Sequence, residues 1–147
     1  MPVTQEQIEP YSTLIRELTQ LYRTFRIIRG ISPSRNMEIF IERKAYLRDA
    51  ITRFFTELIE ARTILDESHV EILDGLVNEA FYYLSILEQL NGVGVEDEQR
   101  IRQSHLNELE ERLDDRFILA EATIRRFLLG FSFRAWWQTR KIKSRRK

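Results

Sequence analysis

The chain has 147 residues, no cysteine and a formal net charge of zero. This length suits one domain, and 43% apolar and 31% charged residues supply a core that a disordered chain lacks. Without cysteine, disulfides, thiolate metal sites and thiol nucleophiles are excluded. No apolar stretch approaches the roughly 20 residues of a transmembrane helix. Residues 1–15 contain two glutamates and no Lys or Arg, so we expect neither a secretory signal nor an Arg-rich presequence.

The charges are distributed very unevenly along the chain. All 23 acidic residues lie at or before Glu121, whereas nine of the 23 basic residues follow it. The chain therefore divides into a body of charge −9 and a C-terminal part of charge +9. Separation of this kind indicates a binding partner or a self-contact rather than a particular fold.

Apolar residues at alternating spacings of three and four predict a first helix over residues 4–28. Thr4 and Gln7 have the Thr-x-x-Gln spacing of a capping box. Gly30, which readily adopts a left-handed cap, and Pro33 mark the end of this helix. The apolar stripe consists of Ile8, Tyr11, Ile15, Leu18, Tyr22 and Phe25, widened by Leu14, Leu21 and Ile28.

A second and a third helix follow from similar patterns. The second is predicted from Pro33, in its first turn, to about Asp66. Its apolar positions are Phe40, Leu47, Ile51, Phe54, Leu58 and Leu65. The third is predicted to open on a capping box of Ser68 and Glu71 and to run to about Leu90. Its apolar positions are Leu73, Leu76, Ala80, Leu84 and Leu87.

A fourth amphipathic pattern predicts a helix over roughly residues 96–129. Its inward positions are Leu106, Leu109, Leu113, Ala120, Ile124 and Phe127. Gly130 interrupts this pattern, so residues 131–147 are expected to form a short C-terminal helix or a basic arm. Short connections and the lack of any alternating strand pattern predict an all-α fold, an antiparallel bundle of four main helices over residues 1–130 with residues 131–147 appended.

The sequence contains little that suggests catalysis. His69 and His105 are the only histidines and do not have the spacing that places two metal ligands on one helical face. Glycine-rich phosphate loops and nucleophile-elbow patterns are missing as well. Acid pairs such as Glu110 and Asp114 are typical of solvated helix faces. We therefore predict a protein that is not an enzyme, has no metal or cofactor, and works by binding.

The C-terminal segment interleaves aromatic residues with cations. Such a segment suits stacking on single-stranded bases with neutralisation of phosphates, or an anionic lipid surface with tryptophan at headgroup depth. It also suits contact with the acidic body of a second copy, and hence a homo-oligomer. The alternative is that the tryptophans close one end of the bundle and the basic end is solvated. The predicted tail-binding residues are Trp136, Trp137, Arg140, Lys141, Lys143, Arg145, Arg146 and Lys147.

A second group of cations lies within the acidic body and suits an acidic partner. The alternative is a set of salt bridges within helices, for example to Glu38 or Glu42, each contributing about 0.2–0.5 kcal/mol. The group comprises Arg16, Arg23, Arg26 and Arg29 on the first predicted helix and Arg43, Lys44 and Arg48 on the second.

Three features occur together in the first half of the chain: Leu21-Tyr22-Arg23 on an amphipathic helix, Pro33 twelve residues after Leu21, and the stretch from Arg48 to Phe55. Together they resemble the LYR-motif family of small mitochondrial helical proteins, over about residues 8–90. That family consists of non-catalytic accessory subunits or assembly factors of respiratory complexes and of iron–sulfur biogenesis, many of which bind acyl carrier protein. The resemblance implies a mitochondrial location and an acyl chain held between the first three helices. It also implies that the acidic carrier would meet Arg23, Arg43, Lys44 and Arg48.

The predicted function is therefore that of a non-enzymatic helical adaptor, or an accessory or assembly subunit of a larger complex, with acyl carrier protein as one candidate partner. The alternative is a nucleic-acid-binding structural or assembly protein, for example viral, that uses the basic tail in the cytoplasm or virion. The predicted partner-binding residues of the body are Leu21, Tyr22, Arg23, Arg43, Lys44, Arg48 and Phe55.

Overall fold

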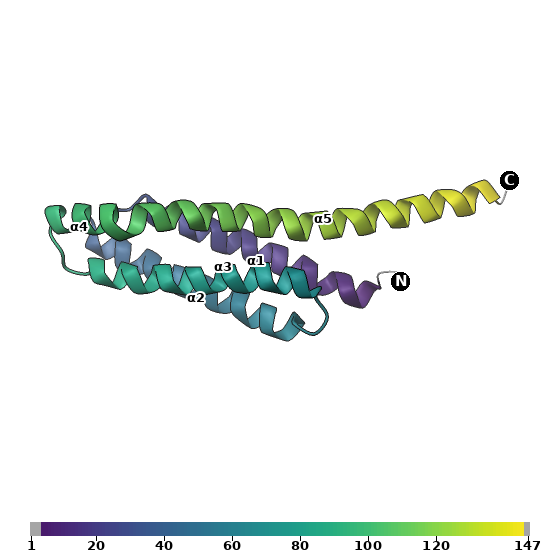
Figure 1. Cartoon of the computed structure of the whole chain (residues 1–147), viewed down its shortest axis with the longest axis horizontal. Helices are drawn as coiled ribbons and strands as arrows, with labels where there is room; N and C mark the ends of the chain where they lie inside the picture. Colours follow the sequence, from purple (N-terminus) through teal and green to yellow (C-terminus); the bar gives the residue numbers. More distant parts are fainter. Residues whose placement is uncertain (1–3, 146–147) are drawn as a thin grey trace.

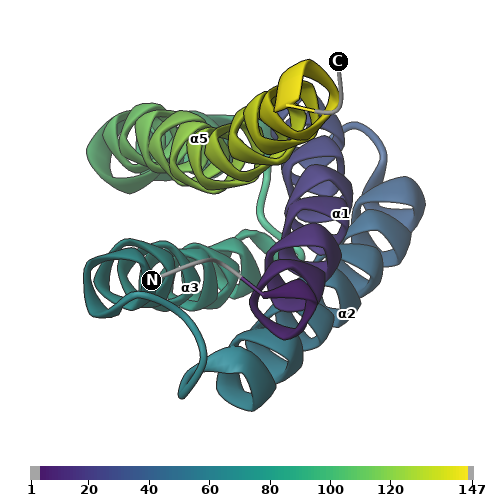
Figure 2. The same ribbon diagram turned by 90° about the vertical axis from the view of Figure 1, so that its right-hand side faces the viewer.

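A computed structural model describes the backbone of residues 4–145 and the side chains of residues 4–130. Every regular element in the described range is helical (Figure 1). The four long helices form an antiparallel bundle in which α1 packs on α2, α2 on α3, and α5 on both α1 and α3 (Figure 2). The predicted fold class is confirmed. The elements are α1 (Gln5–Arg29), α2 (Met37–Ala61), α3 (Glu67–Leu87), η1 (Glu88–Leu90), α4 (Val95–Ile101), η2 (Arg102–Leu106) and α5 (Asn107–Arg145).

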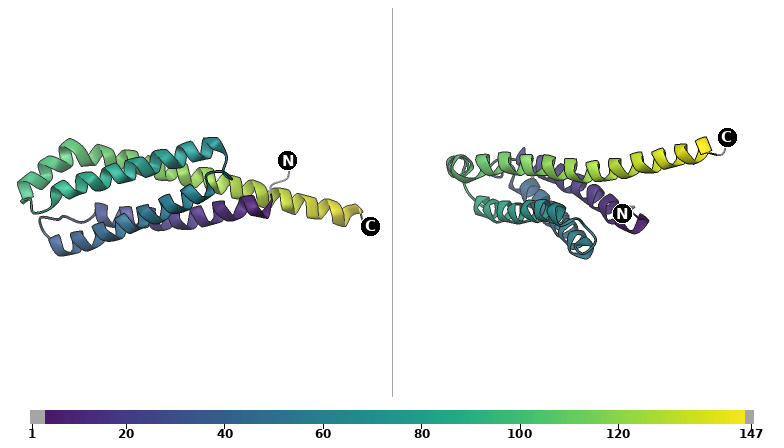
Figure 3. Two further views of the ribbon diagram at one scale, coloured as in Figure 1. Left: turned by 90° about the horizontal axis from the view of Figure 1, so that it is seen from below. Right: turned by 45° about the vertical axis from the view of Figure 1, so that its right-hand side comes forward.

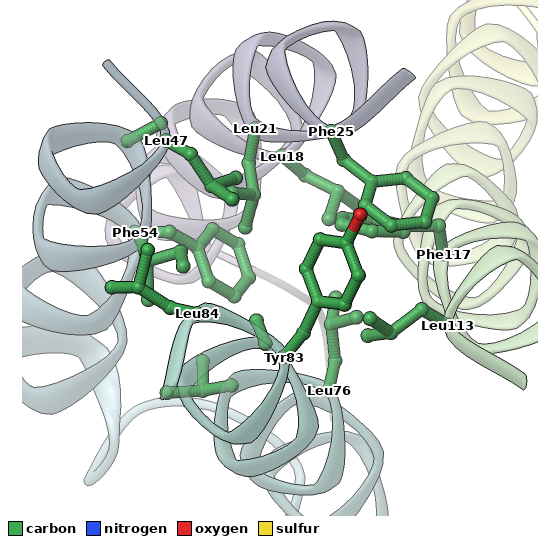
Figure 4. Packing of buried hydrophobic residues seen from close by; sticks show 14 of the residues in the cluster. Leu18, Leu21, Phe25, Leu47, Phe54, Leu76, Tyr83, Leu84, Leu113 and Phe117 are labelled. Atoms are coloured by element: carbon green, nitrogen blue, oxygen red, sulfur yellow. The ribbon is translucent and has the colours of Figure 1, made fainter. Parts of the chain in front are cut away.

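The hydrophobic core lies along the axis of the bundle and draws on all four long helices (Figure 4). At its centre the Phe25 ring of α1 lies 5.3 Å from the rings of both Tyr83 on α3 and Phe117 on α5. Every apolar position predicted for the second and third helices is buried. On α1 the buried stripe is rotated from the predicted one, because this helix packs between α2 and α5. The buried residues of α1 are Tyr11, Leu14, Leu18, Leu21, Phe25 and Ile28.

The start of α1 is as predicted, with Gln7 Oε1 accepting a hydrogen bond from the Thr4 N–H at 3.0 Å. At its end, Gly30 has φ −87°, so the expected left-handed cap is wrong. The predicted start of the second helix at Pro33 is also wrong. Asn36 caps α2 by accepting from the Ile39 N–H at 3.3 Å, and residues 30–36 form the connection.

The predicted capping box of the third helix is wrong as well. The N-cap residue is Asp66, and Ser68 lies within the first turn of α3. The connection before α3 is instead fixed by Tyr11, whose hydroxyl accepts from the Asp66 N–H at 3.1 Å and pairs with His69 Nδ1 at 2.8 Å. The start of α3 is therefore held by a tyrosine of α1, and not by the local capping box that the sequence pattern predicts.

The last part of the chain is one continuous helical rod made of α4, a single π-helical turn (η2) and α5. No break occurs at Gly130, where the sequence pattern predicts an interruption. A single glycine costs a helix only about 1 kcal/mol relative to alanine, which its neighbours offset. The expected separate helix or arm is thus a continuation of α5, which extends past the N-terminal end of α1 (Figures 1 and 3).

Candidate binding surfaces

The three residues of the Leu-Tyr-Arg sequence have different environments on α1. Leu21 is fully buried in the core. Tyr22 is half-buried, and its hydroxyl donates to Asp114 Oδ1 on α5 at 2.5 Å. This hydrogen bond, together with burial, raises the pKa of the Tyr22 hydroxyl above its ordinary value. Arg23 is exposed. Leu21 and Tyr22 thus pack against other helices, whereas Arg23 is exposed to solvent.

Arg23 borders a shallow hollow of about 440 Å³ on the surface of α1. Arg26 lies over the Tyr22 ring, with its guanidinium carbon 5.7 Å from the ring centroid. Ile27, also at this hollow, is 40% exposed. The hollow therefore combines two cations with apolar surface. The sequence pattern included Arg26 among the cations but gave no sign that Ile27 is exposed beside them.

Lys44 does not belong to the predicted cationic surface. Its side chain is buried, and Nζ donates to Glu88 Oε2 at 3.0 Å and to Asn91 Oδ1 at 3.1 Å. Arg48 binds the other oxygen of the same carboxylate at 2.9 Å. The hydrogen bond from Lys44 is the largest of the effects that lower the pKa of Glu88. These two cations join α2 to the end of α3. They therefore form internal salt bridges, the alternative to binding an acidic partner, but between helices rather than within one helix.

The remaining predicted residues of the body lie on separate surfaces. Arg43 is half-buried and stacks over Tyr46, one turn along α2, at 5.6 Å. Lys44 lies on the side of α2 that meets the end of α3. Adjacent residues of a helix point about 100° apart, so Arg43 lies on a different side of α2. Phe55 is half-buried and meets the exposed Phe81 of α3 edge-to-face at 5.8 Å. The structure thus does not unite Arg23, Arg43, Lys44 and Arg48 in one face.

A buried carboxylate that the sequence pattern missed clamps the connection between α1 and α2. Glu98 of α4 accepts from Ser32 Oγ at 2.6 Å and from the Ser34 N–H at 3.0 Å. Arg102 lies 3.9 Å from Glu98 and donates to the Ile31 carbonyl at 2.8 Å. Burial pushes the pKa of Glu98 upward, but these hydrogen bonds and the Arg102 charge outweigh it, so the pKa is lowered.

In a second buried carboxylate, Glu110, the effect of burial outweighs the effects that lower the pKa. Glu110 of α5 is 4% exposed and accepts one hydrogen bond, from the Tyr83 hydroxyl at 2.7 Å. Burial raises the pKa of Glu110, and the Tyr83 bond and the charges of Arg102 and Arg29 offset this only in part. Burial and the nearby Glu110 carboxylate also raise the pKa of Tyr83 well above its ordinary value. The charged residues around Glu110 in the sequence predict a solvated surface acid. That prediction is wrong, because Glu110 is buried.

The predicted tail-binding residues from Trp136 to Arg145 lie on the continuous backbone of α5. Their side chains, and Arg146 and Lys147 altogether, lie outside the described part of the structure. What the structure adds is the position of this segment. It is carried by a helix that is anchored in the core by Phe117 and Ile124 and that then leaves the bundle (Figure 1).

The described residues also bear on two other kinds of feature, a metal site and a membrane-spanning helix. These residues contain no cluster of three or more His, Asp or Glu side chains that could hold a metal ion. Over the same range, every helix is too short or too polar to span a bilayer. Comparison of the chain with models of protein families, with curated proteins and with solved structures finds no match.

Proposed function

We propose that the chain is a non-enzymatic helical adaptor, an accessory or assembly subunit of a larger complex, which binds its partner through the part of α5 beyond the bundle. The observation that carries this proposal is the course of α5, which continues as a helix past the end of α1 (Figure 3). The sequence of this extension holds four aromatic residues, Phe131, Phe133, Trp136 and Trp137, followed by cations. Apolar residues on a helix that leaves the core are typical of an interaction surface.

Deletion of residues 138–147 tests this use of the extension. We expect the deletion to abolish co-purification of the partner from the native source, because it removes six of the nine C-terminal cations. The free energy of unfolding should stay within about 0.5 kcal/mol of the full chain, as for surface changes away from the core. Among the described side chains of α5, the last buried one is Ile124. A partner retained at full yield by the shortened chain would contradict the proposal.

The basic composition of the extension favours nucleic acid as the second candidate partner. Binding to single-stranded nucleic acid should then weaken steeply with salt, with a slope of about −0.7 for each phosphate neutralised. The same shortened chain should not bind. Flotation with anionic liposomes distinguishes a lipid surface from nucleic acid, since both would bind the same cations. An absence of nucleic-acid binding at low salt excludes this candidate.

The narrower proposal, suggested by the LYR-type resemblance, is that the partner is acyl carrier protein in mitochondria. Arg23 and Arg43 are the predicted contact residues that carry no salt bridge among the described side chains. We expect carrier to co-purify with the wild-type chain on co-expression, and a variant carrying Arg23→Glu with Arg43→Glu to lose it.

The matched control for this pair is Arg35→Glu with Arg100→Glu, which changes the charge equally at two exposed arginines that belong to neither α1 nor α2. We expect this control to keep the carrier. Absence of carrier from the wild-type preparation, or its equal loss from both variants, would rule out the narrower proposal and leave the general one standing.

A further inference from the structure

A groove of about 410 Å³ lies between the N-terminal part of α1 and the C-terminal part of α2. Pro10 and the 43% exposed Ile64 give it apolar surface. Carboxylates come from both helices, namely Glu6, Glu9, Glu57 and Glu60. None of the four forms an ion pair with another described residue. The groove is thus an apolar depression between two negatively charged walls.

The backbone adds to this character. Pro10 lies inside α1 and has no N–H, so the carbonyl of Glu6 lacks its usual helical donor. The groove therefore offers hydrogen-bond acceptors and negative charge beside apolar surface. The side chains that match it have an apolar stem and a cationic, donor-only head, as lysine and arginine do.

The C-terminal segment of this chain has that chemistry. Residues 138–147 contain six cations, one isoleucine and no acid. This segment cannot reach the groove of its own chain, because α5 stays helical to Arg145 and leads away from α2 (Figures 1 and 3). Fifteen helical residues beyond Gly130 span about 22 Å. The match is therefore available only between two copies.

We propose that the groove between α1 and α2 of one copy binds the basic C-terminal segment of a second copy. The helix ends that form the groove, the start of α1 and the end of α2, lie at the same end of the bundle as the projecting part of α5 (Figure 1). Two copies related by a twofold axis therefore make the contact twice, which closes the assembly as a dimer. An external partner that binds the same C-terminal segment competes with this dimer. Each C-terminal segment therefore binds either the partner or the groove of a second copy, but not both at once.

The test is the mass of the 147-residue chain, measured by sedimentation velocity. We expect a dimer at about 0.1 M salt and a monomer at about 1 M, where the Debye length falls to about 3 Å. The groove variant Glu57→Lys with Glu60→Lys should weaken the dimer by at least about tenfold, since like charges then face each other. Adding Arg140→Glu, Lys141→Glu and Lys143→Glu to this variant should restore the dimer by exchanging the charges.

The control is Glu108→Lys with Glu111→Lys, an equal change of charge at two exposed positions on α5. We expect it to stay dimeric, and circular dichroism checks that each variant is folded. A wild-type monomer at low salt, a dimer that survives in the groove variant, or equal dissociation of the control overturns the proposal. Because the groove variant keeps its tail intact, it should still bind an external partner, so failure here is distinguishable from failure of the adaptor function.

Discussion

Replacing Phe117 with alanine is expected to lower the free energy of unfolding by about 3–5 kcal/mol, the range for a buried phenylalanine that leaves a cavity. The Phe117 ring is 1% exposed and lies 4.8 Å from the ring of Tyr22 and 5.3 Å from that of Phe25. It joins α5 to α1 at the aromatic centre of the core (Figure 4). Urea denaturation followed by circular dichroism measures the loss.

The adjacent residue supplies the control. Ile118 is 54% exposed, so Ile118→Ala should change the free energy of unfolding by no more than about 0.5 kcal/mol. Similar losses for the two variants would mean that α5 does not pack on α1 as described. A small loss for both would mean that α5 is an appended helix and that the stable core is formed by α1, α2 and α3 alone.

Replacing Glu98 with glutamine is expected to cost about 2 kcal/mol at neutral pH, within the range for hydrogen bonds to a charged group. Glutamine keeps an acceptor for Ser32 or Ser34 but removes the charge that Arg102 faces. Because the folded-state pKa of Glu98 is lowered, its contribution is present above the ordinary value of 4.5 and is lost as the pH falls through the folded-state pKa. The deficit of the variant should therefore shrink in acid.

Glu110→Gln is the matched contrast, with the opposite sign. The pKa of Glu110 is raised, so the folded state binds more protons than the unfolded state above pH 4.5, and the free energy of unfolding falls as the pH rises through the folded-state pKa. Glutamine still accepts from the Tyr83 hydroxyl and carries no buried charge. Its stability relative to wild type should rise with pH over this window. Thermal melts across acidic and neutral pH test both variants. If the stability of the two variants relative to wild type changes with pH in the same way, the opposite pKa shifts of Glu98 and Glu110 are refuted.

The helices were predictable wherever the apolar residues mark a single narrow stripe. On α2 and α3 the apolar spacing alone places Phe54 and Leu84 in the core, and both are buried. On α1 the apolar residues form a wider arc, and the buried part of it is centred on Leu14 and Leu21, with Ile15 and Tyr22 at its edge. Helix ends were less predictable, because the cap at α3 depends on the distant Tyr11 hydroxyl.

The binding surfaces were predictable only in part, because exposure depends on residues far along the chain. Arg43 and Lys44 are equivalent cations in the sequence, and what separates them is Glu88, 44 residues beyond Lys44. Nothing near Glu98 in the sequence indicates that it is buried. Its hydrogen-bond donors, the Ser32 hydroxyl and the Ser34 N–H, come from the distant connection after α1. The acidic groove likewise needs lining residues from α1 and α2, such as Glu9 and Glu57, that lie nearly fifty positions apart in the sequence.

The π-helical turn at Arg102–Leu106 acts as a phase shift in the long final rod. In an uninterrupted α-helix, positions seven residues apart share nearly the same face. Here His105, seven residues after Glu98, is exposed, whereas Leu106, eight residues after it, is buried. The turn takes up one extra residue. Loss of a single residue from it would turn the Glu98 clamp by roughly 100° relative to the core of α5. The chain therefore tolerates a change of residue here far better than a change of length.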